Sequence, residues 1–419
     1  MIFNLLLAAF LAVYFLELIF SLWLDALNRR HLKSQGGQVP KPLEGFIDGQ
    51  RLFRIAAYTQ ENSRFASLRQ ISSDILLLVI LLSGFLPFLD ELARSWGLPF
   101  ILSGLFFWLV PGFISSLFDL PFDYYHTFQI EEKYGFNKAT RKIWVMDQLK
   151  AAALSLVLFS LILSLILWMI RSSPLHWWLW GFLILSFIQL LMVILYPILI
   201  APIFNKFEPL QDQELADQVR HLMREAGIRI KGIFQMDAGK RSRHTNAYFT
   251  GLGKTKRIVL FDTLIQSHPL EEILAVLAHE VGHFKGKHLW KQFFFLECSL
   301  VMAFYIGTQL IDWPLLYQTF GFQDSPPYVG LFLISLLGTK VGFFLSPFFM
   351  ALSRRFERQA DRFALTLIKT PSTMIMVLKR LAADNLSNLF PHPLYVRFHY
   401  SHPPLMERII SLDQETDKK

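Results

Sequence analysis

The chain alternates long apolar runs with polar segments that are rich in Lys and Arg. Seven runs predict membrane-spanning helices, because about 20 mostly apolar residues cross the hydrocarbon core of a bilayer. They comprise residues 1–24, 75–89, 96–117, 151–170, 177–204, 293–311 and 328–350, of which 75–89 is the shortest. The first run lacks a basic start and a small-residue cleavage site, so we expect a retained helix rather than a removable signal peptide.

The distribution of Lys and Arg predicts the orientation, because cationic loops are held on the cytoplasmic side of a membrane. Cationic residues are concentrated in the predicted loops 28–74 and 118–150. The short loops between them carry only Arg94 and Arg171, and residues 312–327 carry none. With seven spans, we expect the N-terminus outside and the C-terminus in the cytoplasm, in a bacterial inner membrane or the endoplasmic reticulum.

Two larger polar segments fall on the expected cytoplasmic side, and we expect them to form one catalytic domain. Short β-branched and aromatic runs within 230–260 predict a small β-sheet or hairpin there. The expected organisation is five N-terminal spans with their loops (1–205), a first polar segment (206–292), two further spans (293–352) and a C-terminal polar segment (353–419).

Composition supports a mainly α-helical, multi-span membrane protein and limits the chemistry of any site. Hydrophobic residues make up 53% of the 419 residues, and the mean hydropathy is +0.38. The net charge of +8 resides mostly in loops that flank apolar runs, so nucleic-acid binding is disfavoured. Cys298 is the only cysteine, which excludes intrachain disulfides and multi-cysteine metal clusters. Any metal must therefore be held by histidines and carboxylates.

The motif H-E-V-G-H, residues 279–283, lies in an apolar-periodic segment that predicts a helix. At 3.6 residues per turn, His279 and His283 lie about 40° apart on one face, so both imidazoles can reach one zinc ion. Glu280 lies beside them and can take a proton from water whose pKa the metal lowers toward ~7. Chance produces H-E-x-x-H in on the order of one such chain in a hundred, and two histidines do not complete a zinc site.

A third ligand is expected from the segment S-R-R-F-E-R-Q-A-D, residues 353–361. Glu357 is the candidate, and Asp361 on the same helical face can accept a hydrogen bond from a ligating histidine. The alternative is a pair of ordinary surface carboxylates in an arginine-rich helix. The positions of the two residues along the chain argue against this alternative. His283 precedes the sixth span and Glu357 follows the seventh, and at a helical rise of ~1.5 Å per residue both lie about 10–15 Å beyond the same membrane face.

Several motifs together resemble those of the type I CAAX prenyl protease family, which comprises seven-span zinc metalloproteases. They are H-E-V-G-H, S-R-R-F-E-R-Q-A-D, R-S-R-H-T-N-A-Y-F-T-G, Y-S-H-P-P-L-M-E-R and the segment F-Q-I-E-E-K-Y-G-F-N-K, so the likeness runs over most of the chain. The resemblance implies zinc on His279, His283 and Glu357, with Glu280 as catalytic base and Asp361 beside the ligands. It also implies a gluzincin-type site at the cytoplasmic end of a chamber enclosed by the spans.

The resemblance implies further roles that the residues alone do not establish. Asn246 and Ala247 are expected to lie along the substrate as an edge strand, since an extended peptide can add to a sheet edge. His402 and Arg408 are expected to approach the site, where a donor or a cation can stabilise an oxyanion. A loop histidine before two prolines is the alternative for His402. His288, nine residues after His279, lies half a turn round the helix, so it is not expected to be a ligand but to lie beside the ligands or at the membrane interface.

Three charged residues fall inside predicted spans: Glu17, Glu297 and Lys340. Charged groups in a bilayer usually face the protein interior or a water-filled cavity, which gives indirect support for a chamber. Snorkelling to the interface or a satisfied ion pair is the alternative. That alternative fits Glu297 best, because it is near the end of its span, and Lys340 worst.

These observations predict a metalloendopeptidase with one zinc ion per chain. Its substrates would be membrane-associated polypeptides, cleaved near the C-terminus if they are of the prenylated CAAX type. One alternative is a quality-control protease for membrane proteins, which would use the same zinc chemistry but would not require a prenylated substrate. The other is a non-catalytic transporter or scaffold, against which the intact set of ligands and base argues.

Overall fold

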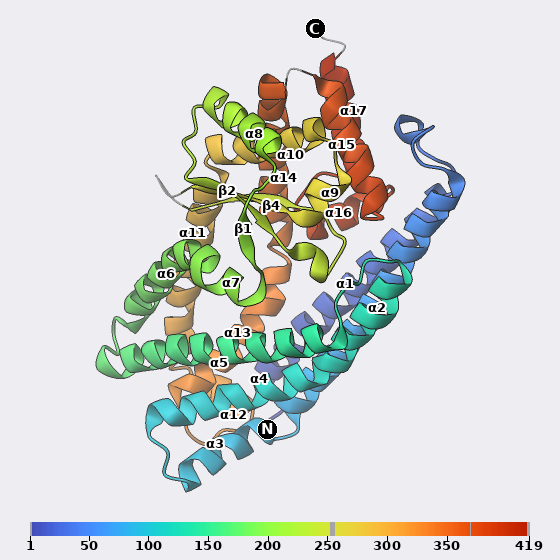
Figure 1. Cartoon of the computed structure of the whole chain (residues 1–419). Coiled ribbons are helices and arrows are strands. Elements are labelled where there is room, and N and C mark those ends of the chain that lie inside the picture. Colours follow the sequence, from blue (N-terminus) through green and yellow to red (C-terminus); the bar gives the residue numbers. More distant parts are fainter. Residues whose placement is uncertain (1, 252–255, 369, 417–419) are drawn as a thin grey trace.

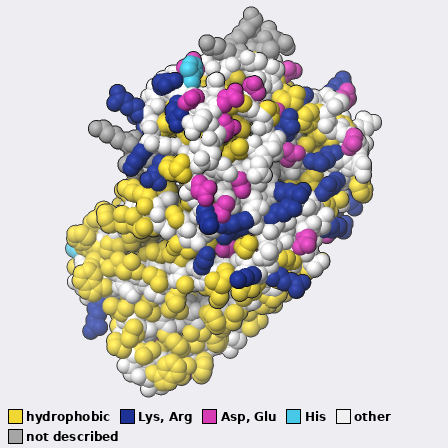
Figure 2. Space-filling model, viewed as in Figure 1, with side chains coloured by type: hydrophobic (Ala, Val, Ile, Leu, Met, Phe, Trp, Pro, Cys, Tyr) yellow, Lys and Arg dark blue, Asp and Glu magenta, His cyan; other side chains and the backbone are white. Residues whose placement is uncertain are grey.

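The computed structural model describes residues 2–251, 256–368 and 370–416. Figure 1 shows two parts: long tilted helices at one end, and a smaller polar domain of short helices around a sheet at the other. Charged side chains cover the surface of the polar domain, whereas the helical end presents a nearly continuous hydrophobic surface (Figure 2). This separation matches a protein whose helical part is immersed in a bilayer.

Six described helical segments are long and apolar enough to cross a membrane. Two contain a π-helical turn: α4 (Phe100–Tyr125) continues into η2 (His126–Glu131), and α6 (Trp177–Leu195) continues through η3 (Tyr196–Ile200) into α7 (Ala201–Phe204). The others are α1 (Leu5–Gln35), α2 (Gly49–Leu82), α5 (Arg141–Ser172) and α11 (His288–Leu310). Short helices α3 (Phe85–Ser95) and α12 (Pro314–Thr319) lie at the end opposite the polar domain (Figure 1).

The seventh span is broken. Helix α13 (Pro327–Phe343) is followed after two residues by α14 (Ser346–Ile368), and their axes differ by 56°. Pro347 lies in the first turn of α14 and has no N–H with which to continue the hydrogen bonding of α13. The expected continuous span 328–350 is therefore wrong at its C-terminal end, although the count of seven holds when the bent pair is one span.

The expected span 75–89 is also wrong in its bounds. Helix α2 ends at Leu82, and Gly84 adopts a left-handed backbone with a φ of 83° before α3 begins. The helix that provides this crossing, α2, starts at Gly49. Its N-terminal half is polar and extends the helix beyond the apolar part that the sequence pattern identified. The apolar pattern located this membrane crossing, but it predicted neither the end of α2 at Leu82 nor the polar extension of the helix back to Gly49.

The small predicted sheet is confirmed and has four strands in the order β1-β2-β4-β3. β2 (Gly232–Met236) and β4 (Arg257–Phe261) are parallel, whereas β1 (Phe207–Pro209) and β3 (Ala247–Thr250) pair antiparallel at the two edges. Helices α8 (Gln213–Glu225), α9 (Asp262–Ser267), α10 (Leu270–Lys285), α15 (Pro371–Asp384), α16 (Pro393–His399) and α17 (Leu405–Thr416) complete the domain with α14. The core of this domain includes Val219, Ile258, Leu260, Leu277 and Val281, which are fully buried.

The charges inside the spans face protein rather than lipid. Lys340 Nζ on α13 lies 2.7 Å from Glu17 Oε2 on α1 and 2.7 Å from Asp74 Oδ1 on α2. The Tyr14 hydroxyl donates a 2.6 Å hydrogen bond to the same Asp74 oxygen. Glu297 on α11 accepts a hydrogen bond from Ser186 on α6, so it contacts a neighbouring helix instead of snorkelling to the interface.

Candidate active site

The motif 279–283 lies on α10, which packs closely against α14. Pro269 caps α10, and Glu271 and Glu272 occupy its first turn, where negative charge favours a helix start. At Gly282 a Cβ atom would lie 2.7 Å from the Cα of Ala360 on α14, so only glycine permits this separation of the two helices. The close contact brings the motif face of α10 against the segment 353–361.

Three donor groups converge between the two helices. The Nε2 atoms of His279 and His283 lie 3.1 Å apart. Glu357 Oε2 is 3.3 Å from His279 Nε2, and Glu357 Oε1 is 3.2 Å from His283 Nε2. All three ligand atoms lie within 4.8 Å of one another, in a geometry that could hold one metal ion.

The tautomer of His279 follows from its contact with Asp361. Its Nδ1 lies 2.8 Å from Asp361 Oδ1, and a carboxylate oxygen in this position accepts the Nδ1 proton. Its Nε2 is therefore the ring nitrogen that faces the donor cluster, where a bound cation would take the place of a proton. Asp361 is in turn fixed by Arg408, whose Nε and Nη2 donate to its two oxygens over 2.9 and 2.6 Å.

A second set of contacts orients His283. His288 Nε2 lies 3.0 Å from Gln359 Oε1, an acceptor, so the His288 proton resides on Nε2 and its Nδ1 accepts. His288 Nδ1 lies 3.1 Å from His283 Nδ1, which must then donate. His283 Nε2 is left with a lone pair that faces Glu357 and His279. The ring of His288 stacks on Phe356 at 4.5 Å, which fixes the ring plane.

The donor set fits a divalent cation. Glu357 Oε2 is buried and has no hydrogen-bond partner among the described residues, although two ring nitrogens face its carboxylate. Burial would lower the pKa of His279, but the close carboxylates of Asp361 and Glu357 outweigh it and raise that pKa to about 9. The cluster thus favours positive charge at its centre. Two imidazoles and one carboxylate form a three-ligand set typical of catalytic zinc.

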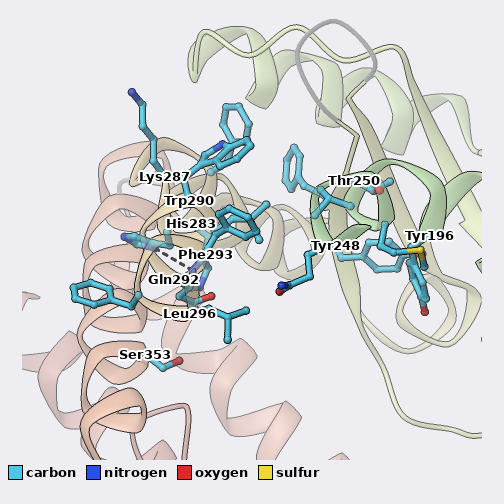
Figure 3. Close-up of a pocket in the computed structure, with 18 of the residues that line it drawn as sticks. Tyr196, Tyr248, Thr250, His283, Lys287, Trp290, Gln292, Phe293, Leu296 and Ser353 are labelled. Atoms are coloured by element: carbon cyan, nitrogen blue, oxygen red, sulfur yellow. Dashed lines mark hydrogen bonds between the residues drawn. The ribbon is translucent and has the colours of Figure 1, made fainter. Parts of the chain in front are cut away.

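Glu280 borders a large cavity that measures about 1630 Å³. Burial raises the pKa of Glu280, which makes its carboxylate a stronger proton acceptor. Figure 3 shows Tyr196, Tyr248 and Thr250 facing His283 and Phe293 across this cavity. Apolar residues of α6 and α11 extend the lining into the membrane part, which confirms the expected chamber.

The two residues predicted to lie along the substrate are at the start of the edge strand β3. Ala247 pairs with Leu260 of β4, and the Asn246 carbonyl accepts a 3.1 Å hydrogen bond from Phe261 N. The opposite edge of β3 has no neighbouring strand in the described sheet. Because β3 also lines the cavity with Glu280, its free edge is available to an extended chain.

The structure brings His402 and Arg408 to the cluster in different ways. His402 is exposed, and its Nε2 lies 3.2 Å from Glu357 Oε1. Arg408 is mostly buried and commits two of its three guanidinium nitrogens to Asp361. The predicted oxyanion role of both residues stays a prediction, and for Arg408 the structure adds a contact that orients Asp361.

Sequence reasoning left His288 a role beside the ligands or at the membrane interface, but it found neither its contact with His283 nor the role of Gln359. It treated residues 279–288 as one helix, but α10 ends at Lys285 and Lys287 adopts a left-handed φ of 53° before α11 starts at His288. The reversal brings His288 back onto His283. The available signal was Gly286, since a glycine after the periodic residues often ends a helix.

Comparisons with known proteins agree with this geometry. Residues 28–206 match the family model described as CAAX prenyl protease N-terminal, five membrane helices, and residues 209–416 match peptidase family M48. A CAAX prenyl protease 1 homolog of Oryza sativa subsp. japonica is 36% identical over 99% of this chain and 98% of that protein. CAAX prenyl protease 1 of Saccharomyces cerevisiae is 33% identical over 93% of this chain and 92% of that protein.

A solved structure extends the likeness to three dimensions. The crystal structure of S. mikatae Ste24p matches with a TM-score of 0.90 and 32% sequence identity, and the match covers 96% of this chain and 97% of that one. The two family models together cover nearly the whole chain, from the membrane helices to the polar domain. The chain therefore belongs to the CAAX prenyl protease 1 family, within the M48 peptidases.

Proposed function

We propose that this membrane peptidase is a zinc-dependent endopeptidase that cleaves prenylated CAAX-type polypeptides near their C-terminus. The observation that carries the proposal is the position of the donor cluster: His279, His283 and Glu357 converge beside Glu280 at an apolar cavity that reaches into the membrane helices. The names of the relatives in the plant and yeast point to the same substrate class.

The metal would be held by His279, His283 and Glu357, and when bound it supplies a Lewis acid that polarises the scissile carbonyl and acidifies water. Glu280 lies at the cavity, where it accepts the proton of the attacking water and returns it to the leaving amine. His402 is exposed and lies 3.2 Å from Glu357 Oε1 through its Nε2, and it would stabilise the developing oxyanion.

The chain would hold its substrate by two kinds of contact. The free edge of β3, starting at Asn246 and Ala247, would pair with the peptide backbone and fix the scissile bond near Glu280. The membrane-side lining would accept the lipid group through apolar residues, among them Leu185, Ile188, Met192, Phe293 and Leu296. Burial of an isoprenyl chain contributes roughly 0.8 kcal/mol per CH₂ equivalent.

The test is an assay of the purified protein on a farnesylated peptide and its unmodified twin, each with and without a zinc chelator. The proposal expects cleavage of the farnesylated peptide that the chelator abolishes and added zinc restores. Equal cleavage of both peptides would favour the quality-control protease over the prenyl-dependent one. Cleavage that survives complete removal of metal would refute the zinc mechanism.

We further propose that the polar domain and the C-terminus are cytoplasmic and the N-terminus is outside, in the orientation that the Lys and Arg distribution favours. The polar domain and the end of α17 lie at one end of the molecule, opposite α3 and α12 (Figure 1). A substrate synthesised in the cytoplasm would then meet the β3 edge directly and insert only its lipid group toward the membrane part.

A further inference from the structure

The loop 241–246, which leads directly into the edge strand β3, is attached to the membrane helices. Its backbone pairs with the segment after η2: Lys138 N donates to the Arg241 carbonyl over 3.0 Å, and Arg243 N donates to the Phe136 carbonyl over 3.1 Å. Asn137 and Ser242 form an isolated β-bridge between these two hydrogen bonds. The start of β3 is thus placed by a neighbour outside the sheet.

His244 is the centre of this attachment. Its Nδ1 lies 2.9 Å from Asn385 Oδ1, and its Nε2 lies 3.5 Å from Glu131 Oε2. Its ring stacks on Phe136 with centroids 4.4 Å apart and an interplanar angle of 18°. Its carbonyl accepts a 2.9 Å hydrogen bond from Thr263 Oγ1. His244 therefore joins the loop, the polar domain and the end of a membrane helix.

Glu131 belongs to the membrane part. It is the last residue of the π-helical turn η2 that extends α4, and the Tyr58 hydroxyl on α2 donates to its Oε1 over 2.6 Å. The contact with Glu131 raises the pKa of His244, and it does so more strongly than burial lowers that pKa. π-helical turns are rare and are frequent at functional sites. The turn aims Glu131 at the loop.

Arg241 provides a second attachment three residues earlier. Its Nε and Nη2 donate to the two oxygens of Asp147 on α5 over 2.6 and 2.8 Å, and its Nη1 donates to Asn205 Oδ1, after α7, over 2.8 Å. A two-pronged guanidinium–carboxylate contact fixes direction as well as distance. Three membrane segments, α4 with η2, α5 and α7, thus hold one short loop.

We propose that Arg241 and His244 are positioning residues for substrate. They fix the free edge of β3 relative to the membrane helices and thereby set the register of the peptide at Glu280. This inference rests on the proposed function, in which β3 pairs with the substrate. β4 fixes β3 from one side only, so the loop determines where Asn246, two residues after His244, presents its edge.

The proposal predicts that substitution of Arg241 or His244 weakens substrate binding and leaves metal binding unchanged. The side-chain hydrogen bonds and ion pairs of Arg241 and His244 within the described residues go to Asp147, Asn205, Asn385 and Glu131, and not to the donor cluster or Glu280. Loss of the loop contacts would let β3 shift along the cavity while the donor cluster between α10 and α14 stays in place. A change in KM with little change in kcat is the signature of lost uniform binding.

The experiment compares His244→Phe with His244→Gln in the full-length detergent-purified enzyme. Phenylalanine keeps the stacking on Phe136 but loses both hydrogen bonds, whereas glutamine keeps a donor and an acceptor. The control is His221→Phe, the same substitution at an exposed histidine of α8. We expect His244→Phe to raise KM roughly tenfold with kcat within about threefold, and His244→Gln to restore most of the loss.

A second pair of variants tests the membrane side. Asp147→Asn weakens the contact with Arg241, and its control is Asp217→Asn at an exposed aspartate of α8 that also pairs with an arginine. We expect a KM increase for Asp147→Asn in the same direction as for His244→Phe. Hydrogen exchange without substrate provides a readout independent of activity: the amides of β3 should exchange about tenfold faster in His244→Phe, whereas β2 should be unchanged.

The outcomes separate this proposal from the proposed function. If the wild-type protein cleaves neither peptide in a chelator-sensitive way, the proposed function fails, and hydrogen exchange still decides the positioning role. Wild-type KM and wild-type β3 exchange in His244→Phe and Asp147→Asn would overturn the positioning role. Zinc loss or a lower melting temperature in proportion to lost activity would also overturn it, because the loop would then be merely structural.

Discussion

Each histidine of the donor cluster, His279 and His283, is held through the ring nitrogen that faces away from the cluster. Asp361 lies against Nδ1 of His279, and His288 with Gln359 lies against Nδ1 of His283, so Nε2 is the nitrogen of each ring that faces the cluster. Partners of this kind typically change metal affinity or activity by about 10–100-fold when removed. The two histidines are supported by chemically different partners: a carboxylate that Arg408 secures for His279, and a neutral imidazole for His283.

Substitution of Glu280 by glutamine separates metal binding from proton transfer. Glu280 lines the cavity and is not one of the three converging ligands, so Glu280→Gln should keep its zinc. We expect kcat to fall by at least about 10²–10⁴-fold, because glutamine cannot accept a proton from water. Elemental analysis and peptide cleavage on the same preparation check this, with His279→Ala as the variant that should lose metal. Undiminished turnover would contradict the assigned base.

The sequence predicted the residues of the cluster better than their connections. His279, His283, Glu357 and Asp361 have a recognisable spacing along helices, and spacing along a helix determines direction. His288 could not be placed in this way, because its position depends on the chain reversal at Lys287, which is a matter of backbone φ rather than of side-chain pattern. The contact between Arg408 and Asp361 joins two segments 47 residues apart and has no periodic signal.

At the scale of elements, the contact between α10 and α14 builds the site. Two side chains of the donor cluster come from α10 and one from α14, so the distance between the helices sets the size of the site proposed for the metal. Gly282 and Ala360 permit that distance because neither has a bulky side chain. The sequence pattern predicted each helix as an extension of a span, whereas a break separates each helix from that span: residues 286–287 lie between α10 and α11, and 344–345 between α13 and α14.

Gly282→Ala should therefore damage the metal site without touching a ligand. The new Cβ would lie 2.7 Å from Ala360 Cα and 2.8 Å from its carbonyl oxygen, so one helix must move. We expect zinc content to fall and cleavage to drop about 10²-fold, as a displacement of ~1 Å can cause. Gly338→Ala on α13 is the control, because its Cβ would meet nothing within 4 Å. Normal zinc and activity in Gly282→Ala would show that the two helices tolerate a wider separation.

The ion cluster around Lys340 holds α13, the first helix of the broken seventh span, against α1 and α2. Lys340→Met leaves Glu17 and Asp74 buried without their cation, and removal of one partner of a buried ion pair costs about 3–5 kcal/mol. We expect a clearly lower melting temperature in detergent, partly restored by adding Glu17→Gln and Asp74→Asn. Lys142→Met, at an exposed lysine of α5, should melt like the wild type. An unchanged melting temperature for Lys340→Met would mean that packing alone holds α13 against α1 and α2.

At the scale of the whole molecule, the separation of apolar and charged surface was readable from the sequence because it is a property of composition along the chain. The helix count of seven and the small sheet follow from the same pattern. The polar domain is built from residues 206–292 and 353–416. The sequence predicted that these two segments lie on the same side of the membrane, but not how they pack together. The internal arrangement of the domain depends on long-range contacts, such as Arg380 with Glu272, that no local pattern encodes.

The orientation of the whole molecule in the membrane, with the polar domain in the cytoplasm, is a prediction that a labelling experiment can test. α3 lies at the end opposite the polar domain, so Glu91 on α3 and His221 on α8 should face opposite sides of the membrane (Figure 1). In a variant with Cys298→Ser, we expect Glu91→Cys to react with an impermeant maleimide added outside sealed cells. His221→Cys should react only after permeabilisation, because cationic loops remain in the cytoplasm. The reverse pattern would place the metal centre outside, where a cytoplasmic prenylated substrate could not reach it.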